Sequence, residues 1–126
     1  MSFFLLMFAA AISLFGAFFH GVVGGRLYIK NIDNSNLEPL GKSLSLVSWH
    51  MFTIFLFVGA VAFALVAFNQ LSAVAVYPLI VINALGALMF LFLAFGKHKH
   101  LLKMPGAYLL GTTALCGYLG IFLFHK

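Results

Sequence analysis

Long apolar runs alternate with short polar stretches along the whole chain, and this alternation predicts its elements. Four runs hold the roughly 20 apolar residues that a helix needs to cross the hydrocarbon core of a bilayer. They cover approximately residues 3–25, 44–68, 72–95 and 105–124. The pattern therefore predicts an all-α fold, a single transmembrane domain over residues 1–126 built as an integral membrane four-helix antiparallel bundle.

The three connections between the runs differ in length and polarity. The first, residues 26–43, is rich in turn formers and helix breakers and is expected to be a loop. The second, residues 69–72, is short enough for a tight hairpin between neighbouring antiparallel helices. The third, residues 97–103, ends shortly before Pro105, which suits the first turn of a helix.

Composition supports a membrane protein and excludes several kinds of chemistry. Of the 126 residues, 64% are hydrophobic and 7% are charged, unlike an average soluble domain. Both acids, Asp33 and Glu38, lie in the first connection, so the apolar runs contain no carboxylate. Cys116 is the single cysteine and cannot form an intramolecular disulfide. These absences argue against proton-coupled export of cations, thiol–disulfide exchange and an autonomous enzyme.

The basic residues predict an orientation in the membrane. Six of the seven lie in the first and third connections: Arg26, Lys30, Lys42, Lys97, Lys99 and Lys103. Because cytoplasmic loops are enriched in Lys and Arg, both connections are expected to be cytoplasmic, with Lys126 and both termini on the other side. The first run is expected to stay in the protein, because it is too long for a signal-peptide core and no Lys or Arg precedes it.

Two histidines lie inside the apolar runs and mark a candidate site. His20 lies near the end of the first run and His50 near the start of the second, each about one and a half helical turns from the first connection. A polar ring in hydrocarbon is costly and is by default functional or partnered. Helical spacing puts His20 on a stripe of small residues and His50 on a face with Thr53. Both rings are therefore predicted to point into the bundle and to face each other or one shared ligand.

Several explanations of this pair remain open. The imidazoles, with each other or with a hydroxyl such as Thr53 or Thr112, could form structural hydrogen bonds between helices. They could instead ligate the iron of a b-type haem, bind a quinone or relay a proton, or hold a metal ion. The haem interpretation adds basic partners for the propionates and an aromatic jacket. Its candidate residues are His20, His50, Arg26, Lys30, Phe19 and Trp49, with Phe18, Phe52 and Phe57 as further jacket residues.

The sequence around the two histidines also resembles a known group. The first run closes on His20-Gly21-Val22-Val23-Gly24-Gly25-Arg26, and the second opens with Trp49-His50. Over roughly the first half of the chain this resembles a widespread group of uncharacterised small bacterial four-helix membrane proteins, whose pattern is His-small-x-x-Gly-Glu-Arg followed by Trp-His. The resemblance implies a fold, a marked histidine pair and a multi-pass location in the bacterial inner (cytoplasmic) membrane. Gly25 replaces the usual Glu, so a role that depends on that carboxylate does not carry over.

Two functions from different classes follow. The protein is expected to be an accessory or assembly subunit of a larger membrane complex, because small residues such as Gly117 and Gly120 offer packing faces to other chains. The alternative is an electron-transfer module with haem b, or a quinone or proton site, on His20 and His50. The expected partners are the lipid bilayer, anionic head groups at the Lys97–Lys103 cluster, and other membrane subunits or further copies of the chain. Nucleic acid is not expected, because the loop bias already explains the net charge of +5.

Overall fold

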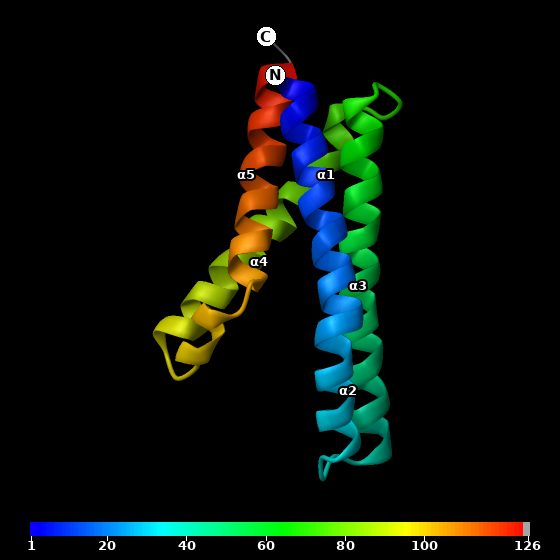
Figure 1. Ribbon diagram of the computed structural model, residues 1–126, viewed down its shortest axis with the longest axis vertical. Coiled ribbons are helices and arrows are strands. Elements are labelled where there is room, and N and C mark those ends of the chain that lie inside the picture. The colour runs from blue at the N-terminus through cyan, green and yellow to red at the C-terminus, as the bar shows by residue number, and fades with distance from the viewer. Residues whose placement is uncertain (125–126) are drawn as a thin grey trace.

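The computed structural model of the protein describes residues 1–124, and within them it contains helices and no strands (Figure 1). In chain order the elements are α1 (Ser2–Phe18), the π-helical η1 (Phe19–Gly24), α2 (Gly25–Asp33), α3 (Pro39–Ala67), the 3-10 helix η2 (Ala73–Val76), α4 (Tyr77–Phe95), the 3-10 helix η3 (Lys99–Lys103) and α5 (Gly106–Phe124).

Four continuous helical stretches are long and apolar enough to cross a membrane. They are Ser2–Asp33, Pro39–Ala67, Ala73–Phe95 and Gly106–Leu123. The all-α class and the number of candidate spans predicted from the sequence are therefore confirmed.

The expectation that residues 26–43 form one long loop is wrong. The first helix continues to Asp33 and α3 begins at Pro39, so only residues 34–38 connect them. Residues 26–33 contain neither glycine nor proline, and Pro39 takes the first helical position, where its missing N–H costs nothing. Lys42 Nζ then donates a hydrogen bond of 2.7 Å to the carbonyl oxygen of Asp33, which holds the two helix ends together.

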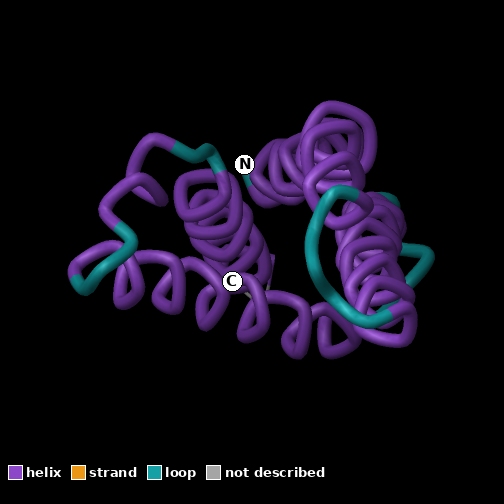
Figure 2. Tube along the Cα trace, turned by 90° about the horizontal axis from the view of Figure 1, so that it is seen from below, coloured by secondary structure: helices purple, strands orange, loops and turns teal. Residues whose placement is uncertain are grey.

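The helices form two arms that meet at one end of the molecule. The first arm is α1, η1, α2 and α3, and the second arm is α4, η3 and α5 (Figures 1 and 2). The start of α1 packs against the end of α5, where Ser2 Oγ donates a hydrogen bond of 2.6 Å to Gly120 O. At the other end, which carries the first and third connections, the arms diverge (Figure 1). The chain therefore does not close a four-helix bundle along its whole length.

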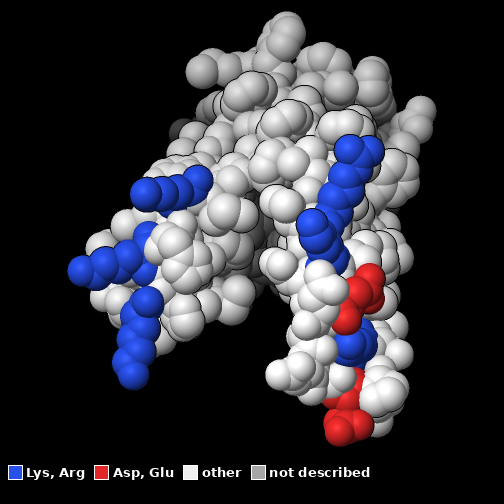
Figure 3. All heavy atoms as spheres, turned by 60° about the horizontal axis from the view of Figure 1, so that its bottom comes forward, with Lys and Arg blue, Asp and Glu red and all other residues white. Residues whose placement is uncertain are grey.

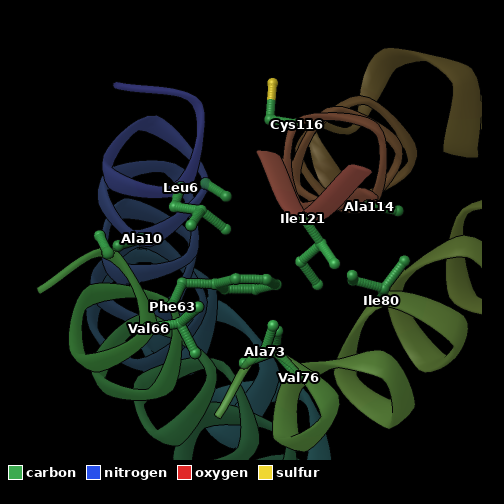
Figure 4. Packing of buried hydrophobic residues seen from close by; sticks show 12 residues of the cluster. Leu6, Ala10, Phe63, Val66, Ala73, Val76, Ile80, Ala114, Cys116 and Ile121 are labelled. Carbon is green, nitrogen blue, oxygen red and sulfur yellow. The ribbon is translucent and has the colours of Figure 1, made fainter. Parts of the chain in front are cut away.

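The main core lies where the arms meet. Figure 4 shows Phe63 of α3 among apolar side chains from the other long helices. Glycines on α5 permit this packing: a Cβ at Gly117 would lie 2.7 Å from Phe63 Cε1, and one at Gly120 would lie 2.8 Å from Leu6 Cγ. The expectation that these small residues offer a free face to other chains is therefore wrong, because the chain's own side chains already cover them.

The small-residue stripe of α1 is also internal. Ala9 and Ser13 are buried, and Ser13 Oγ donates a hydrogen bond of 2.8 Å to the carbonyl oxygen of Leu56 on α3. Gly16 lies against the Leu56 side chain. Close backbone approach is what such stripes allow between membrane helices. In this protein it joins α1 to α3.

Candidate functional site

An apolar cleft of about 380 Å³ lies between the two arms. Residues of α1, η1 and α3 line it from one side, and residues of α4, η3 and α5 from the other. Figure 3 shows the molecule from the diverging end, with the hollow between the arms. His20 is the only residue with an acid or base side chain in the lining, and the other side chains there with a hydroxyl or ring N–H are Ser13, Trp49 and Thr113.

His20 reaches this cleft from the π-helical turn η1. Such a turn inserts one extra residue into a helix and commonly occurs at functional sites. The glycines of the turn let α3 come unusually close. A Cβ at Gly21 would lie 2.9 Å from Thr53 Cγ2, and one at Gly24 would lie 3.0 Å from Trp49 Cζ2.

The imidazole of His20 is held by a hydrogen bond to α3. Its Nδ1 lies 2.9 Å from Thr53 Oγ1, and Thr53 Oγ1 lies 3.3 Å from the carbonyl oxygen of Trp49. In the Nδ1–H tautomer the Thr53 oxygen accepts from His20 and Nε2 carries the lone pair, whereas in the other tautomer Thr53 donates to Nδ1 and Nε2–H is a donor. In both tautomers Nδ1 is the nitrogen that contacts Thr53. No other hydrogen bond reaches this ring within residues 1–124.

Aromatic stacking fixes the plane of the same ring. His20 stacks on Trp49 with ring centroids 3.9 Å apart, and Trp49 stacks on Tyr28 at 4.1 Å. Phe52 meets His20 edge-on at 5.0 Å. Offset stacked and edge-on contacts of this kind stabilise aromatic clusters. The column of three rings, together with Thr53, sets the direction of Nε2.

The indole N–H of Trp49 is a second unusual polar group. Nε1 is buried and has no hydrogen-bond partner among the described residues. Gly25 lies beside this nitrogen, because a Cβ there would be 3.5 Å from Nε1. Glycine offers no side-chain acceptor there, so this N–H stays unpaired.

The structure does not place His50 as the sequence predicted. His50 is exposed and does not line the cleft. The face of α3 that contacts the first helix carries Trp49 and Thr53, and His50 lies about 100° around the helix from Trp49. The two imidazoles are close enough to interact electrostatically, but in the described part of the chain no hydrogen bond or ring contact joins them. The prediction that His50 points into the bundle is therefore wrong, because its side chain is exposed. The prediction that the two rings face each other or one shared ligand stays a prediction.

The other predicted site residues divide between the cleft and the outer surface. Phe19, Trp49 and Phe52 line the cleft. Arg26 and Lys30 are exposed and line a shallow groove on α2. Phe18 and Phe57 are exposed.

Sequence reasoning offered a hydroxyl of the last helix, such as Thr112, as a partner of the histidines, but it missed the apolar lining that the second arm contributes. Met89, Phe90, Met104, Leu109 and Leu110 line the cleft opposite His20. The one signal in the sequence was the break in the helical pattern before the last helix, at residues 104–106. In the structure Gly106 makes room for the Phe90 ring, because a Cβ at this position would lie 2.7 Å from Phe90 Cε1.

A multinuclear or carboxylate-rich metal site is not present in the described residues, where no three His, Cys, Asp or Glu side chains gather. Cys116 is buried and unpaired on α5.

Comparisons of the chain with protein-family models, with curated proteins and with solved structures find no match. The resemblance carried by residues 20–26 and 49–50 therefore stays a prediction, and the site has to be understood from its own geometry.

Proposed function

We propose that this protein binds one amphiphilic membrane-soluble molecule in the cleft between its arms, with His20 as the polar contact. The observation that supports this proposal is the His20 imidazole, which lines an otherwise apolar cleft. Its Nδ1 is hydrogen-bonded, while its Nε2 has no partner among the described residues. An unpaired ring nitrogen in apolar surroundings is costly. A ligand that combines an apolar body with a hydroxyl, which can donate or accept, would satisfy Nε2 in either tautomer and fill the cleft.

The size of the cleft favours a small molecule over a helix of another protein. A volume of about 380 Å³ falls in the range of small-molecule pockets. Three turns of a helix about 10 Å wide would need on the order of 1,000 Å³. The lining is also aliphatic and aromatic on both arms, which suits a hydrocarbon chain or a quinol ring.

We further propose the topology that places this cleft near the cytoplasmic face of a bacterial inner membrane. All six Lys and Arg of residues 1–124 lie at the diverging end of the arms (Figure 3); Lys126 is outside the described residues. The positive-inside bias then puts that end in the cytoplasm, with the spans antiparallel and both termini on the opposite side. In a Cys116→Ser background, a cysteine at position 34 should be labelled only from the cytoplasm, and periplasmic labelling would contradict this.

A role as an accessory or assembly subunit stays a prediction. The small-residue faces that suggested it are covered within the chain. The outer surface instead carries large apolar side chains such as Phe92 and Phe95, each 79% exposed. Such residues suit lipid contact, so the structure adds no separate support for a partner subunit.

Haem b is a second candidate, because a free Nε2 is what an axial ligand of haem iron needs. The predicted second ligand, His50, is exposed and outside the cleft. Within the lining, the thioethers of Met89 and Met104 are the other side chains able to bind iron. A haem at this site would therefore be held by His20 with a residue of the second arm. Sharp Soret and α bands in the dithionite-reduced spectrum of purified protein would establish it.

The proposed function is tested by measuring how much amphiphile stays bound to the purified protein, by solvent extraction and by native mass spectrometry. Wild type should retain about one amphiphile per chain. His20→Phe keeps an aromatic ring against Trp49 but removes Nε2, and should lower occupancy about fivefold to tenfold, as expected for one hydrogen bond. His50→Phe is the matched control and should retain the ligand. Equal retention by both variants, or equal loss, would refute the role of His20.

A further inference from the structure

We infer that the occupant of the cleft is a neutral quinone or its quinol, with one ring oxygen at His20 and the opposite ring oxygen at Thr113. This inference rests on the proposed function and names the ligand class for that same site. It depends on Thr113 of α5, which the proposed function does not use.

The described residues of the lining leave two polar side chains free to bind a ligand. Apart from His20, the side chains there with a hydroxyl or ring N–H are Ser13, Trp49 and Thr113. Ser13 Oγ already donates to the carbonyl oxygen of Leu56, and Trp49 Nε1 is enclosed by protein. The hydroxyl of Thr113 is therefore the second group that can contact the occupant.

The Thr113 hydroxyl is buried without a partner. Only 2% of the residue is exposed, and no hydrogen bond reaches its hydroxyl within residues 1–124. The neighbouring Thr112 shows the usual alternative, because its Oγ1 donates a hydrogen bond of 2.7 Å to the carbonyl oxygen of Tyr108 one turn earlier. A buried hydroxyl without a partner costs free energy. A ligand oxygen at Thr113 would remove that cost.

The cleft suits an uncharged ligand. Among the described residues its lining contains no Lys, Arg, Asp or Glu. A carboxylate or phosphate buried there would have no Lys or Arg partner, and an unpaired buried charge is costly. The lining therefore disfavours fatty acids and the head groups of phospholipids.

His20 and Thr113 lie on opposite walls of the cleft. His20 belongs to the first arm and Thr113 to the second, and both line the space between the arms. A molecule that reaches both needs polar atoms on opposite sides of an apolar body. A para-quinone has this form, with a carbonyl oxygen on each side of a flat ring. A monoacylglycerol carries its hydroxyl and ester oxygens together at one end, so it matches only one wall.

The lining also suits a flat ring in either redox form. Phe19 and Phe52 on the first arm and Phe90 on the second present aromatic rings to the cleft, and such rings stack on or meet another ring edge-on. A hydroxyl both donates and accepts, and an imidazole nitrogen does one or the other according to the tautomer. His20 and Thr113 can therefore bind the carbonyl oxygens of a quinone or the hydroxyls of a quinol.

Trp49 provides a probe inside the site. It is the single tryptophan of the chain, lines the cleft and stacks on His20. Quinone rings quench indole fluorescence at short range, and so do bromine atoms on an acyl chain. The experiment reconstitutes the full chain in phosphatidylcholine bilayers. Into these it titrates either a para-benzoquinone with a decyl chain or a monoacylglycerol with a brominated acyl chain.

The expected result is saturable quenching by the quinone, half-maximal at a mole fraction about threefold or more below that of the brominated monoacylglycerol, as expected for one additional hydrogen bond. Thr113→Val keeps the shape of the side chain and removes the hydroxyl. It should raise the quinone mole fraction at half-quenching by about threefold to tenfold and leave quenching by the monoacylglycerol unchanged.

Two further variants separate the hydroxyl from packing. Thr113→Ser keeps the hydroxyl and should bind the quinone like wild type. Thr112→Val is the matched control at the next position, because Thr112 does not line the cleft and its hydroxyl is bonded to its own helix. It should leave quenching by the quinone unchanged.

The opposite outcomes have separate meanings. Quenching by the monoacylglycerol at an equal or lower mole fraction than the quinone would overturn the quinone and leave amphiphile binding standing. Equal quinone binding by Thr113→Val and Thr112→Val, or equal loss in Thr113→Val and Thr113→Ser, would show that the Thr113 hydroxyl is not a contact and would also overturn the inference. Saturable quenching by neither probe would overturn the proposed function as well.

Discussion

At the scale of single residues, the partner of His20 decides what the site can do. The sequence offered His20 two kinds of partner, His50 or a hydroxyl such as Thr53, and the structure selects Thr53 at 2.9 Å. Binding through Nδ1 leaves Nε2 for a ligand.

Replacing Thr53 with Val tests this hydrogen bond, because Val keeps the shape and removes the hydroxyl. We expect a loss of roughly 0.5–1 kcal/mol in the free energy of unfolding, the usual size of an interhelical hydrogen bond in a membrane protein. Thermal unfolding in detergent measures it. Thr53→Ser keeps the hydroxyl and should lose less. A Val variant as stable as wild type would show that Thr53 does not hold the ring.

At the scale of elements, the π-helical turn η1 sets the contact between the first helix and α3. Gly21 and Gly24 bring Thr53 and Trp49 within reach of His20. The sequence marked these glycines as a small-residue motif, but it did not show which of them contact α3. It also missed the continuation into α2, because polar residues such as Asn31 and Asp33 are typical of loops and yet lie here on a helix.

Alanine substitutions in η1 and α2 should separate contact glycines from tolerant ones. A Cβ at Gly21 would lie 2.9 Å from Thr53 Cγ2, and Thr53 is held by bonds to His20 and Trp49. Gly21→Ala should therefore destabilise by about 1–3 kcal/mol, the cost of overpacking. At Gly25 the nearest atom is 3.5 Å away, so Gly25→Ala should be neutral or stabilise by up to about 1 kcal/mol. Urea or thermal unfolding measures both, and the reverse order would contradict this packing.

At the scale of the whole molecule, one shared core joins the two arms at one end, and the cleft lies between them where they diverge. Phe63 is fully buried where the arms meet, between Gly117 of α5 and the helices of its own arm. Beyond this core the arms diverge (Figure 1). The shape of the cleft therefore depends on packing at the opposite end of the protein.

Substitutions on α5 test this shared core. Gly117→Ala would put a Cβ 2.7 Å from Phe63 Cε1 and 3.2 Å from Ile80 Cγ1, so we expect a loss of about 1–3 kcal/mol in stability. Gly111→Ala is the control on the same helix, because its Cβ would lie at an ordinary 3.6 Å from Ala87. The midpoint of thermal unfolding measures both. If Gly117→Ala left the chain fully stable but released it from a complex, Gly117 would face another protein after all.

The sequence by itself determined the all-helical class, the number of spans and the marked position of His20. These depend on local properties: the length of an apolar run against the bilayer thickness, and the cost of a polar ring within it. Tertiary structure alone decided how each helix is rotated about its axis. This rotation exposes His50, packs Gly117 against Phe63 of the same chain and places Met104 in the lining of the cleft. The physical reason is that α1, α3, α4 and α5 are apolar on nearly every side. Such a sequence carries no periodic difference between a buried and a lipid-facing side, so only the packing of side chains between helices distinguishes the two.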